Sequence, residues 1–249
     1  MNLFCFAYAG GSSNIFLKWK KYSDHLINVV PVEMPGRGAR FTEEFCDNMT
    51  DLIDDLFNKI KSELTNDSYM LYGHSMGSWI VYYLTCRIMK EGMRLPERVF
   101  ISGKEAPHII KNDIVVHKLN NYEFLKKIYS LGGTPKEIMD NEEMLDIFIP
   151  IIKNDYKVIE TCQFEQLLQS LECDITVFNG RKDQLTLQDL YGWRIYTKGN
   201  FKLHQFEGGH FFINDYAKAI MSIIKSQLEK DLVKKKCKSQ IQRRRKVRV

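Results

Sequence analysis

The sequence contains no apolar run long enough to cross a bilayer, so we expect no membrane span. Its first residues lack the basic segment and the small-residue cleavage site of a signal peptide. The six cysteines lie far apart, without a CxxC pair or a zinc-ligand spacing. These absences argue against a secreted, membrane-embedded or zinc-stabilised protein, and the simplest interpretation is a cytoplasmic, metal-free chain.

Nucleotide-binding motifs are also missing. The glycine-rich loop Ala9-Gly10-Gly11 could cradle a phosphate, but it matches neither G-x-G-x-x-G nor G-x-x-x-x-G-K-[ST]. We therefore expect no cofactor. No internal repeat is present, and the length of 249 residues fits one α/β domain.

The net charge of +5 is concentrated at one end of the chain. Residues 230–249 hold ten Lys or Arg and one Asp, whereas the rest of the chain has 26 basic and 30 acidic residues. Such a run could bind nucleic acid, anionic lipid or an acidic protein. Repulsion between like charges and the shortage of core-forming residues favour a disordered, solvated tail over residues 231–249. We therefore expect neither nucleic-acid nor membrane binding.

Strands and helices alternate along most of residues 1–230. Strands are predicted at Asn2–Tyr8, Asn28–Glu33, Tyr69–Tyr72, Arg98–Ser102, Asp174–Asn179 and Phe201–Phe206. Between them, apolar residues recur at helical spacing, for example from Leu52 to Leu64. This alternation predicts an α/β fold, a mostly parallel sheet flanked by helices.

The alternation stops between about residues 108 and 171, called here the helical insertion. Helices are expected at Asn121–Ser130, Asn141–Lys153 and Tyr156–Leu171, with no strand between them. An insertion of this length after a strand predicts a lid over an active site.

The motif Gly73-His74-Ser75-Met76-Gly77 lies between an apolar strand pattern and a helical pattern. Strand, sharp turn and helix are the context that a G-x-S-x-G nucleophile elbow requires. The glycines avoid a clash where strand and helix approach closely. The motif therefore predicts Ser75 as a catalytic nucleophile.

A serine nucleophile needs a base and an orienting carboxylate, in the chain order Ser, Asp or Glu, His. Of the six histidines only His210 fits this order, on the Gly208-Gly209 loop before the last helix. Asp183 follows a predicted strand at the matching edge of the sheet. The alternatives are a packed loop histidine and an ordinary turn or cap aspartate.

An oxyanion hole needs two backbone N–H donors. Met76, directly after the nucleophile, is expected to supply one, and Ala9, in the small-residue loop after the first strand, the other.

Two further groups of residues have open interpretations. The aromatic residues Phe124, Tyr129, Phe148 and Tyr156 either line an acyl tunnel or simply pack the insertion. In the turn containing Arg37 and Arg40, the arginines either contact a phosphate or an acidic partner, or are solvated.

In this order, the residues resemble the type II (external, stand-alone) thioesterases of non-ribosomal peptide and polyketide synthesis. The resemblance is carried by segments along nearly the whole chain: Phe4–Ser12, Pro31–Arg40, Gly73–Gly77, Ser102–Pro107, Leu131–Glu137, Pro150–Tyr156 with the acidic Asp155, and Gly208–Ile213. Ala7 and Glu105 depart from the family pattern, and the basic tail lies outside it.

The resemblance implies an α/β-hydrolase fold with a mobile lid and a triad of Ser75, Asp183 and His210. The implied substrate is an acyl thioester on the phosphopantetheine arm of a carrier protein, cleaved as an editing step. We expect the protein to act as a monomer. Alternatives left open are a medium-chain acyl-carrier-protein thioesterase, a general carboxylesterase and an inactive carrier-binding scaffold.

Overall fold

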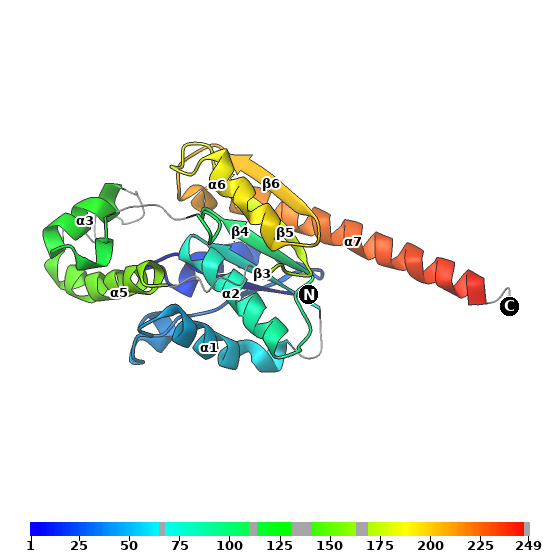
Figure 1. Cartoon of the computed structure of the whole chain (residues 1–249), viewed down its shortest axis with the longest axis horizontal. Helices are drawn as coiled ribbons and strands as arrows, with labels where there is room; N and C mark the ends of the chain where they lie inside the picture. The colour runs from blue at the N-terminus through cyan, green and yellow to red at the C-terminus, as the bar shows by residue number, and fades with distance from the viewer. Residues whose placement is uncertain (65–67, 110–113, 131–140, 163–168, 247–249) are drawn as a thin grey trace.

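The computed structural model describes residues 1–64, 68–109, 114–130, 141–162 and 169–246. In this part of the chain, six strands form one parallel sheet in the order β2-β1-β3-β4-β5-β6 (Figure 1). The strands are β1 (Asn2–Phe6), β2 (Asn28–Pro31), β3 (Tyr69–His74), β4 (Arg98–Ser102), β5 (Asp174–Gly180) and β6 (Phe201–Phe206). The predicted parallel sheet is confirmed.

Helices connect the strands. The α-helices are α1 (Met49–Ile60), α2 (Met76–Lys90), α3 (Asn121–Ser130), α5 (Glu142–Glu160), α6 (Leu187–Tyr191) and α7 (Ala217–Lys246). The 3₁₀ helices are η1 (Ser13–Tyr22), η2 (Gly38–Arg40), η3 (Lys61–Glu63), η4 (Val116–Lys118), η5 (Gly192–Tyr196) and η6 (Phe212–Asn214). The apolar spacing from about Ile15 to His25 predicts an amphipathic helix. The structure has a helix in this segment, η1, but it is of the 3₁₀ type and ends at Tyr22.

The start and the buried face of helix α1 follow from its local sequence. The Asn48 side chain accepts a hydrogen bond from the Asp51 N–H at 3.0 Å, which caps the helix at its first turn. Its apolar residues at helical spacing are all buried, as predicted: Leu52, Ile53, Leu56, Phe57 and Ile60.

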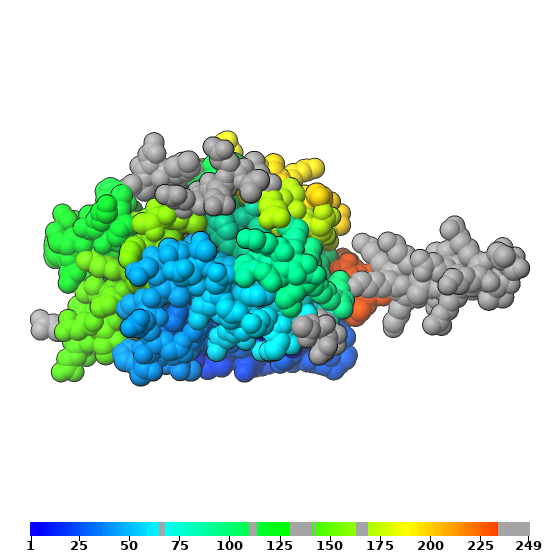
Figure 2. Space-filling view, turned by 60° about the horizontal axis from the view of Figure 1, so that its bottom comes forward, coloured from blue at the N-terminus to red at the C-terminus, as the bar shows by residue number. Residues whose placement is uncertain are grey.

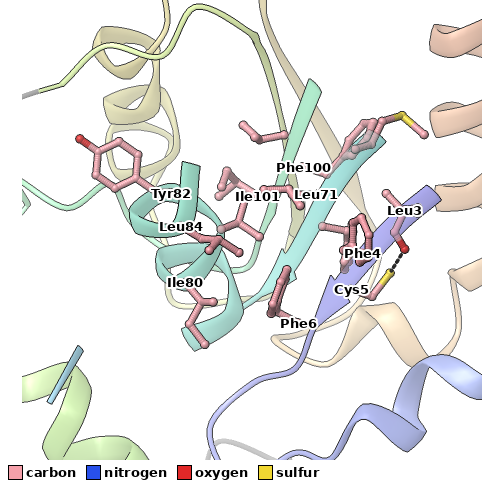
Figure 3. Close-up of a cluster of buried hydrophobic side chains, with 14 of the residues drawn as sticks. Leu3, Phe4, Cys5, Phe6, Leu71, Ile80, Tyr82, Leu84, Phe100 and Ile101 are labelled. Carbon is pink, nitrogen blue, oxygen red and sulfur yellow. Dashed lines mark hydrogen bonds between the residues drawn. The ribbon is translucent and has the colours of Figure 1, made fainter. Parts of the chain in front are cut away.

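Two faces of the sheet are covered. Helices α1 and α2 contact each other, and Figure 1 shows them on the near side of the sheet. On the other side, the Tyr72 ring of β3 packs on Trp19 of η1, with ring centroids 4.9 Å apart. Met70, on the same side of β3, lies beside Leu228 of α7 around a small cavity. Figure 3 shows side chains of β1, β3, β4 and α2 meeting in the resulting core.

The strand register brings the carboxyl ends of the strands to one edge of the sheet. Phe6 is paired with Gly73, and His74 with Ser102. Because the strands are parallel, the loops after β1, β3, β5 and β6 all leave from this edge. Those loops carry the residues that the sequence predicts to be functional.

The described elements of the helical insertion, between β4 and β5, are η4, α3 and α5. They enclose a separate small core of Val116, Phe124, Ile128, Ile149 and Ile152. Figures 1 and 2 show the insertion at one end of the molecule, and in Figure 2 it adjoins the segment that follows β2.

Two helix boundaries in the insertion differ from the prediction. The expected break between Lys153 and Tyr156 is wrong, because α5 runs unbroken from Glu142 to Glu160. Buried residues continue at helical spacing across the expected break, from Ile151 to Asp155 and Val158, which explains the continuity. The expected helix end at Leu171 is also wrong, because α5 ends at Glu160 and Leu171 is not helical; residues 163–168 of that expected helix lie outside the described residues.

Helix α7 runs from Ala217 to Lys246. Its helical backbone therefore continues past Lys230, after which the sequence predicts a disordered tail. In the described part of the chain, no helix combines the length and the apolar character that a bilayer span would need.

Candidate active site

Ser75 lies at the sharp turn between β3 and α2. Its backbone has φ 54° and ψ −117°, and it is the only non-glycine residue with positive φ among the residues described. Such a conformation costs on the order of 1–3 kcal/mol and persists only where the surrounding structure imposes it. The Ser75 N–H donates to the Ser102 carbonyl oxygen at 2.7 Å, so the end of β4 holds the turn.

The two glycines of the motif allow this turn to be tight. A Cβ on Gly73 would lie 1.9 Å from the carbonyl oxygen of Gly77, and a Cβ on Gly77 would lie 2.2 Å from that of Phe6. Both neighbours are backbone atoms of packed elements and cannot move aside. The steric reason that the motif gives for its flanking glycines is therefore confirmed.

His210 and Asp183 form a hydrogen-bonded pair across two loops. His210 Nδ1 lies 2.9 Å from Asp183 Oδ2, although the residues come from the loops after β6 and β5. The Lys182 N–H donates to the Gly208 carbonyl oxygen at 2.9 Å and joins the same loops through their backbones. The exposed fraction is 6% for the Asp183 side chain and 21% for His210, so the carboxylate is shielded while the imidazole reaches solvent.

His74, the residue before Ser75, connects the serine turn to this pair. Its ring is buried and lies 5.1 Å from the His210 ring, centroid to centroid. Its Nδ1 is 2.8 Å from Ser102 Oγ, and its Nε2 has no hydrogen-bond partner among the described residues. Burial, together with the nearby His210, holds the pKa of His74 well below its usual range, so the ring is neutral.

The structure therefore brings His74, Asp183 and His210 together at the edge of the sheet where Ser75 turns. Within the described residues no hydrogen bond joins Ser75 to His210. In free enzymes such bonds are often long and tighten only when substrate is bound, so the arrangement still suits nucleophilic catalysis.

Met76 and Ala9 lie on the two segments from which oxyanion donors are expected. Met76 is the first residue of α2, whose first N–H groups have no acceptor within the helix. In the loop after β1, the Gly11 N–H donates to the Tyr8 carbonyl oxygen at 2.8 Å and the Gly10 N–H to Asp155 Oδ2 at 2.7 Å. The structure gives the Ala9 N–H no acceptor among the described residues.

The arginine turn serves a structural purpose that the sequence analysis missed. Arg37 and Arg40 are buried, and neither expectation for them, partner contact or solvation, is correct. Arg37 forms two hydrogen bonds to Asp155, Nη1 to Oδ2 at 2.5 Å and Nη2 to Oδ1 at 2.7 Å. Arg40 pairs with Glu43 and with Asp55, the latter from α1. Buried guanidinium groups require such partners. Asp155 and Asp55 come from α5 and α1, whereas Glu43 lies only three residues after Arg40.

The aromatic residues of the insertion are divided between its core and its surface. Phe124 is fully buried in the small core, with Phe148 and Tyr156 packed against it. Tyr129 is 56% exposed. Packing within the insertion therefore accounts for three of the four residues considered for an acyl tunnel.

Comparison with known proteins extends this picture. Residues 1–228 match the model of the thioesterase domain family. The chain is 33% identical to linear gramicidin dehydrogenase LgrE of Brevibacillus parabrevis, over 93% of this chain and 89% of LgrE. It is 31% identical to the medium-chain S-acyl fatty acid synthase thioesterase of Rattus norvegicus, over 85% of this chain and 81% of the rat protein.

Solved structures agree. ClbQ, from the colibactin NRPS/PKS pathway, superposes with a TM-score of 0.88 at 31% identity, covering 93% of this chain and 98% of ClbQ. BorB, the type II thioesterase of the borrelidin cluster, has a TM-score of 0.82 at 28% identity, covering 91% and 92%. The predicted α/β-hydrolase fold and the resemblance to type II thioesterases are confirmed. The chain belongs to the thioesterase domain family.

Proposed function

We propose that this thioesterase acts through a triad of Ser75, His210 and Asp183. The observation that carries the proposal is the Asp183–His210 hydrogen bond of 2.9 Å, formed at the sheet edge where Ser75 is held at positive φ. The packing of the fold alone does not require these three residue types at three separate loops. In this arrangement they suit acyl transfer to a serine.

In the proposed reaction, His210 takes the Ser75 proton as the hydroxyl oxygen adds to the thioester carbonyl carbon. The resulting tetrahedral intermediate expels the thiol, which receives the proton from His210. Water, deprotonated by His210, then attacks the acyl-serine ester and releases the carboxylic acid and free Ser75. Asp183 keeps the imidazole in the tautomer that can accept the serine proton. These steps require no cofactor.

The N–H groups of Met76 and Ala9 are proposed to stabilise the oxyanion of both tetrahedral intermediates. Removing one such donor lowers kcat on the order of 10²–10³-fold in enzymes of this type. The free N–H at the start of α2 and the Ala9 N–H support this assignment.

The proposed substrate is an acyl or aminoacyl thioester on the phosphopantetheine arm of a carrier protein, removed when a synthetase stalls. The carrier is therefore the proposed partner, and the helical insertion is proposed to act as a lid over the acyl group. The similarity to ClbQ and BorB supports this editing role.

The second candidate is chain termination on an acyl carrier protein with medium-length acyl groups. It is favoured by the similarity to the rat fatty acid synthase thioesterase. A general carboxylesterase would use the same triad, and a catalytically inactive carrier-binding scaffold would not need it.

The deciding experiment measures hydrolysis of acetyl- and longer acyl-phosphopantetheinyl carrier protein, beside a simple aryl ester, by the wild type and Ser75→Ala. We expect the wild type, but not Ser75→Ala, to release the acyl group rapidly from the carrier. Short acyl groups should be preferred if the enzyme edits. A preference for medium-length chains would favour the terminator. Cleavage of the aryl ester alone would favour the carboxylesterase, and no Ser75-dependent turnover would leave the scaffold.

A further inference from the structure

The Asp155 carboxylate links the helical insertion to the loop that carries Ala9. Asp155 belongs to α5 and is 2% exposed. Its Oδ2 accepts the Gly10 N–H at 2.7 Å, a contact between residues 145 positions apart in the chain. Arg37 neutralises the carboxylate through the two hydrogen bonds already described.

Helix α5 also lies directly over this loop. A Cβ on Gly10 would lie 2.5 Å from Cγ1 of Ile152, one turn before Asp155 on the same helix. Gly10 has a φ of +78°, a conformation that glycine adopts without strain. The close approach and the hydrogen bond together seat α5 on the peptide unit that follows Ala9.

The far end of the loop is anchored by another buried carboxylate. Glu33 accepts hydrogen bonds from the Ser12 hydroxyl at 2.8 Å and from the Ser13 N–H and hydroxyl, both at 2.9 Å. Between these anchors the Gly11 N–H is bonded to the Tyr8 carbonyl oxygen. The loop residues after Ala9 are therefore held on both sides, with Asp155 holding the residue next to Ala9.

A buried ion pair is a weak source of stability, because desolvation offsets the attraction between its charges. Replacing such a pair with apolar residues of similar volume is often neutral or stabilising. The Arg37–Asp155 pair is therefore better explained by the geometry that it imposes than by the energy that it adds.

We propose that Asp155 is a positioning residue for the oxyanion hole, and that seating of α5 on the body of the enzyme sets the Ala9 N–H for catalysis. The Gly10 N–H belongs to the peptide unit that begins at the Ala9 carbonyl, and the Ala9 N–H belongs to the preceding unit, which the Gly11 N–H holds through the Tyr8 carbonyl oxygen. Fixing the Gly10 unit therefore limits rotation at Ala9, between the two units. When α5 lifts, Gly10 loses its acceptor and the loop can rotate. Stabilisation of the oxyanion, and hence turnover, is thereby restricted to the state with the insertion seated. This inference rests on the proposed function.

The test compares two double variants that both remove the buried charges. Arg37→Met with Asp155→Asn keeps an acceptor for the Gly10 N–H, whereas Arg37→Met with Asp155→Leu removes it. For the Leu variant we expect kcat about 10- to 100-fold below that of the Asn variant, less than the loss of a whole oxyanion donor. KM is expected to stay within about threefold.

An alkylboronic acid provides a second readout. Ser75 Oγ adds to boron and His210 takes the proton, so the tetrahedral boronate places an oxygen in the oxyanion hole. The affinity for this acid is expected to fall by the same factor as kcat, because both depend on the oxyanion donors. The pH profile of kcat/KM should keep its shape, since the Asp183–His210 pair is untouched. If Asp155 were purely structural, kcat and boronate affinity would not fall by the same factor while KM and the pH profile stay unchanged.

Lys157→Met is the matched control on the same helix. Lys157 pairs with Asp47 at 2.6 Å on the surface and does not touch the Gly10 loop, so kcat is expected to change by less than about twofold.

Equal kcat values in the folded Asn and Leu double variants would overturn the inference. If either double variant fails to fold, Asp155→Ala, which removes the acceptor of the Gly10 N–H, is measured alone. A fall in its kcat without a matching fall in boronate affinity would then refute the proposal, and so would wild-type values for both, whereas parallel falls would support it. Failure of the triad itself is distinguishable, because Ser75→Ala would then retain wild-type turnover.

Discussion

The body of the molecule and the helical insertion are stabilised in different ways. In the body, buried side chains from the sheet and the surrounding helices form one continuous apolar core. The insertion has its own small core and contacts the body through polar groups as well as through the end of α5. Those polar contacts include Asp155 with Arg37 and Gly10, Asn154 with the Cys46 carbonyl oxygen, and Lys157 with Asp47.

In the proposed role as a lid, this difference would let the insertion move while the body stays folded. Polar groups that separate regain hydrogen bonds to water, whereas separated apolar surfaces lose their favourable burial. The end of α5 is an exception, because Val158 is packed in the main core. In the proposed lid motion the insertion would pivot near Val158, while its polar contacts exchange with water.

The largest expected effect comes from a substitution in the body, where the proposed catalytic residues lie. Ser75→Ala should lower kcat by at least about 10⁴-fold, since the proposed nucleophile is lost. Alanine keeps the Cβ of serine and therefore the same backbone strain, so the thermal midpoint should stay within a few degrees. Steady-state hydrolysis and thermal unfolding measure the two effects. Residual turnover above one percent would show that another group carries the reaction.

A pair of core substitutions compares the two regions directly. Ile101→Ala, at a fully buried position of β4, should cost about 2–5 kcal/mol in the free energy of unfolding. Ile149→Ala, in the small core of the insertion, should lower this global free energy less and instead raise hydrogen exchange in α3 and α5. Urea unfolding combined with hydrogen exchange separates the two responses. Equal global losses with unchanged exchange in α3 would mean that insertion and body unfold as one unit.

Protonation of His74 should weaken the body at mildly acidic pH. In the unfolded chain this histidine binds a proton near pH 6.5, but in the folded protein burial holds its pKa well below that value. The unfolded state therefore binds more protons in this range, and stability falls as pH drops below about 6.5.

The variant His74→Gln should show a flatter dependence of stability between pH 5 and pH 7, measured by urea unfolding. The exposed His25, replaced by Gln, is the control. An unchanged slope in the His74 variant would contradict the assignment of a neutral, buried ring.

The smallest effect is expected from a surface pair within the body. Asp24 pairs with Lys225 of α7, and this hydrogen bond, with the Leu26 N–H, lowers the pKa of Asp24 to about 2. The stabilising contribution is complete above about pH 4 and is lost as pH falls toward 2. Asp24→Asn should remove this part of the acid dependence, seen in acid unfolding by circular dichroism. Identical acid transitions in the two proteins would show that the pair contributes nothing.

The sequence predicted those features that depend on local patterns. Alternating periodicities located all six strands of the described sheet to within a few residues, and the bounds of α3 matched the predicted Asn121–Ser130. The elbow motif predicted both the turn at Ser75 and the steric need for its glycines. Chain order selected Asp183 and His210, which the structure brings within hydrogen-bond distance.

The features that the sequence did not reveal depend on contacts between distant segments. Arg37 and Asp155 are 118 positions apart, and nothing near either residue indicates that they meet. His74 occupies the variable position of its motif, so its burial against Ser102 was not expected. The segment containing Asp155 was recognised by resemblance, but its contact with Gly10 required the structure.

The positive φ of Ser75 has a consequence for how this chain would evolve. Glycine adopts that conformation freely, so Ser75→Gly should relieve strain and, with the proposed nucleophile removed, abolish catalysis. Selection of random variants for thermal stability alone would therefore enrich glycine at this position, and selection for growth that depends on turnover would restore serine. The residue at position 75 would thus indicate whether a lineage was selected for stability or for catalysis.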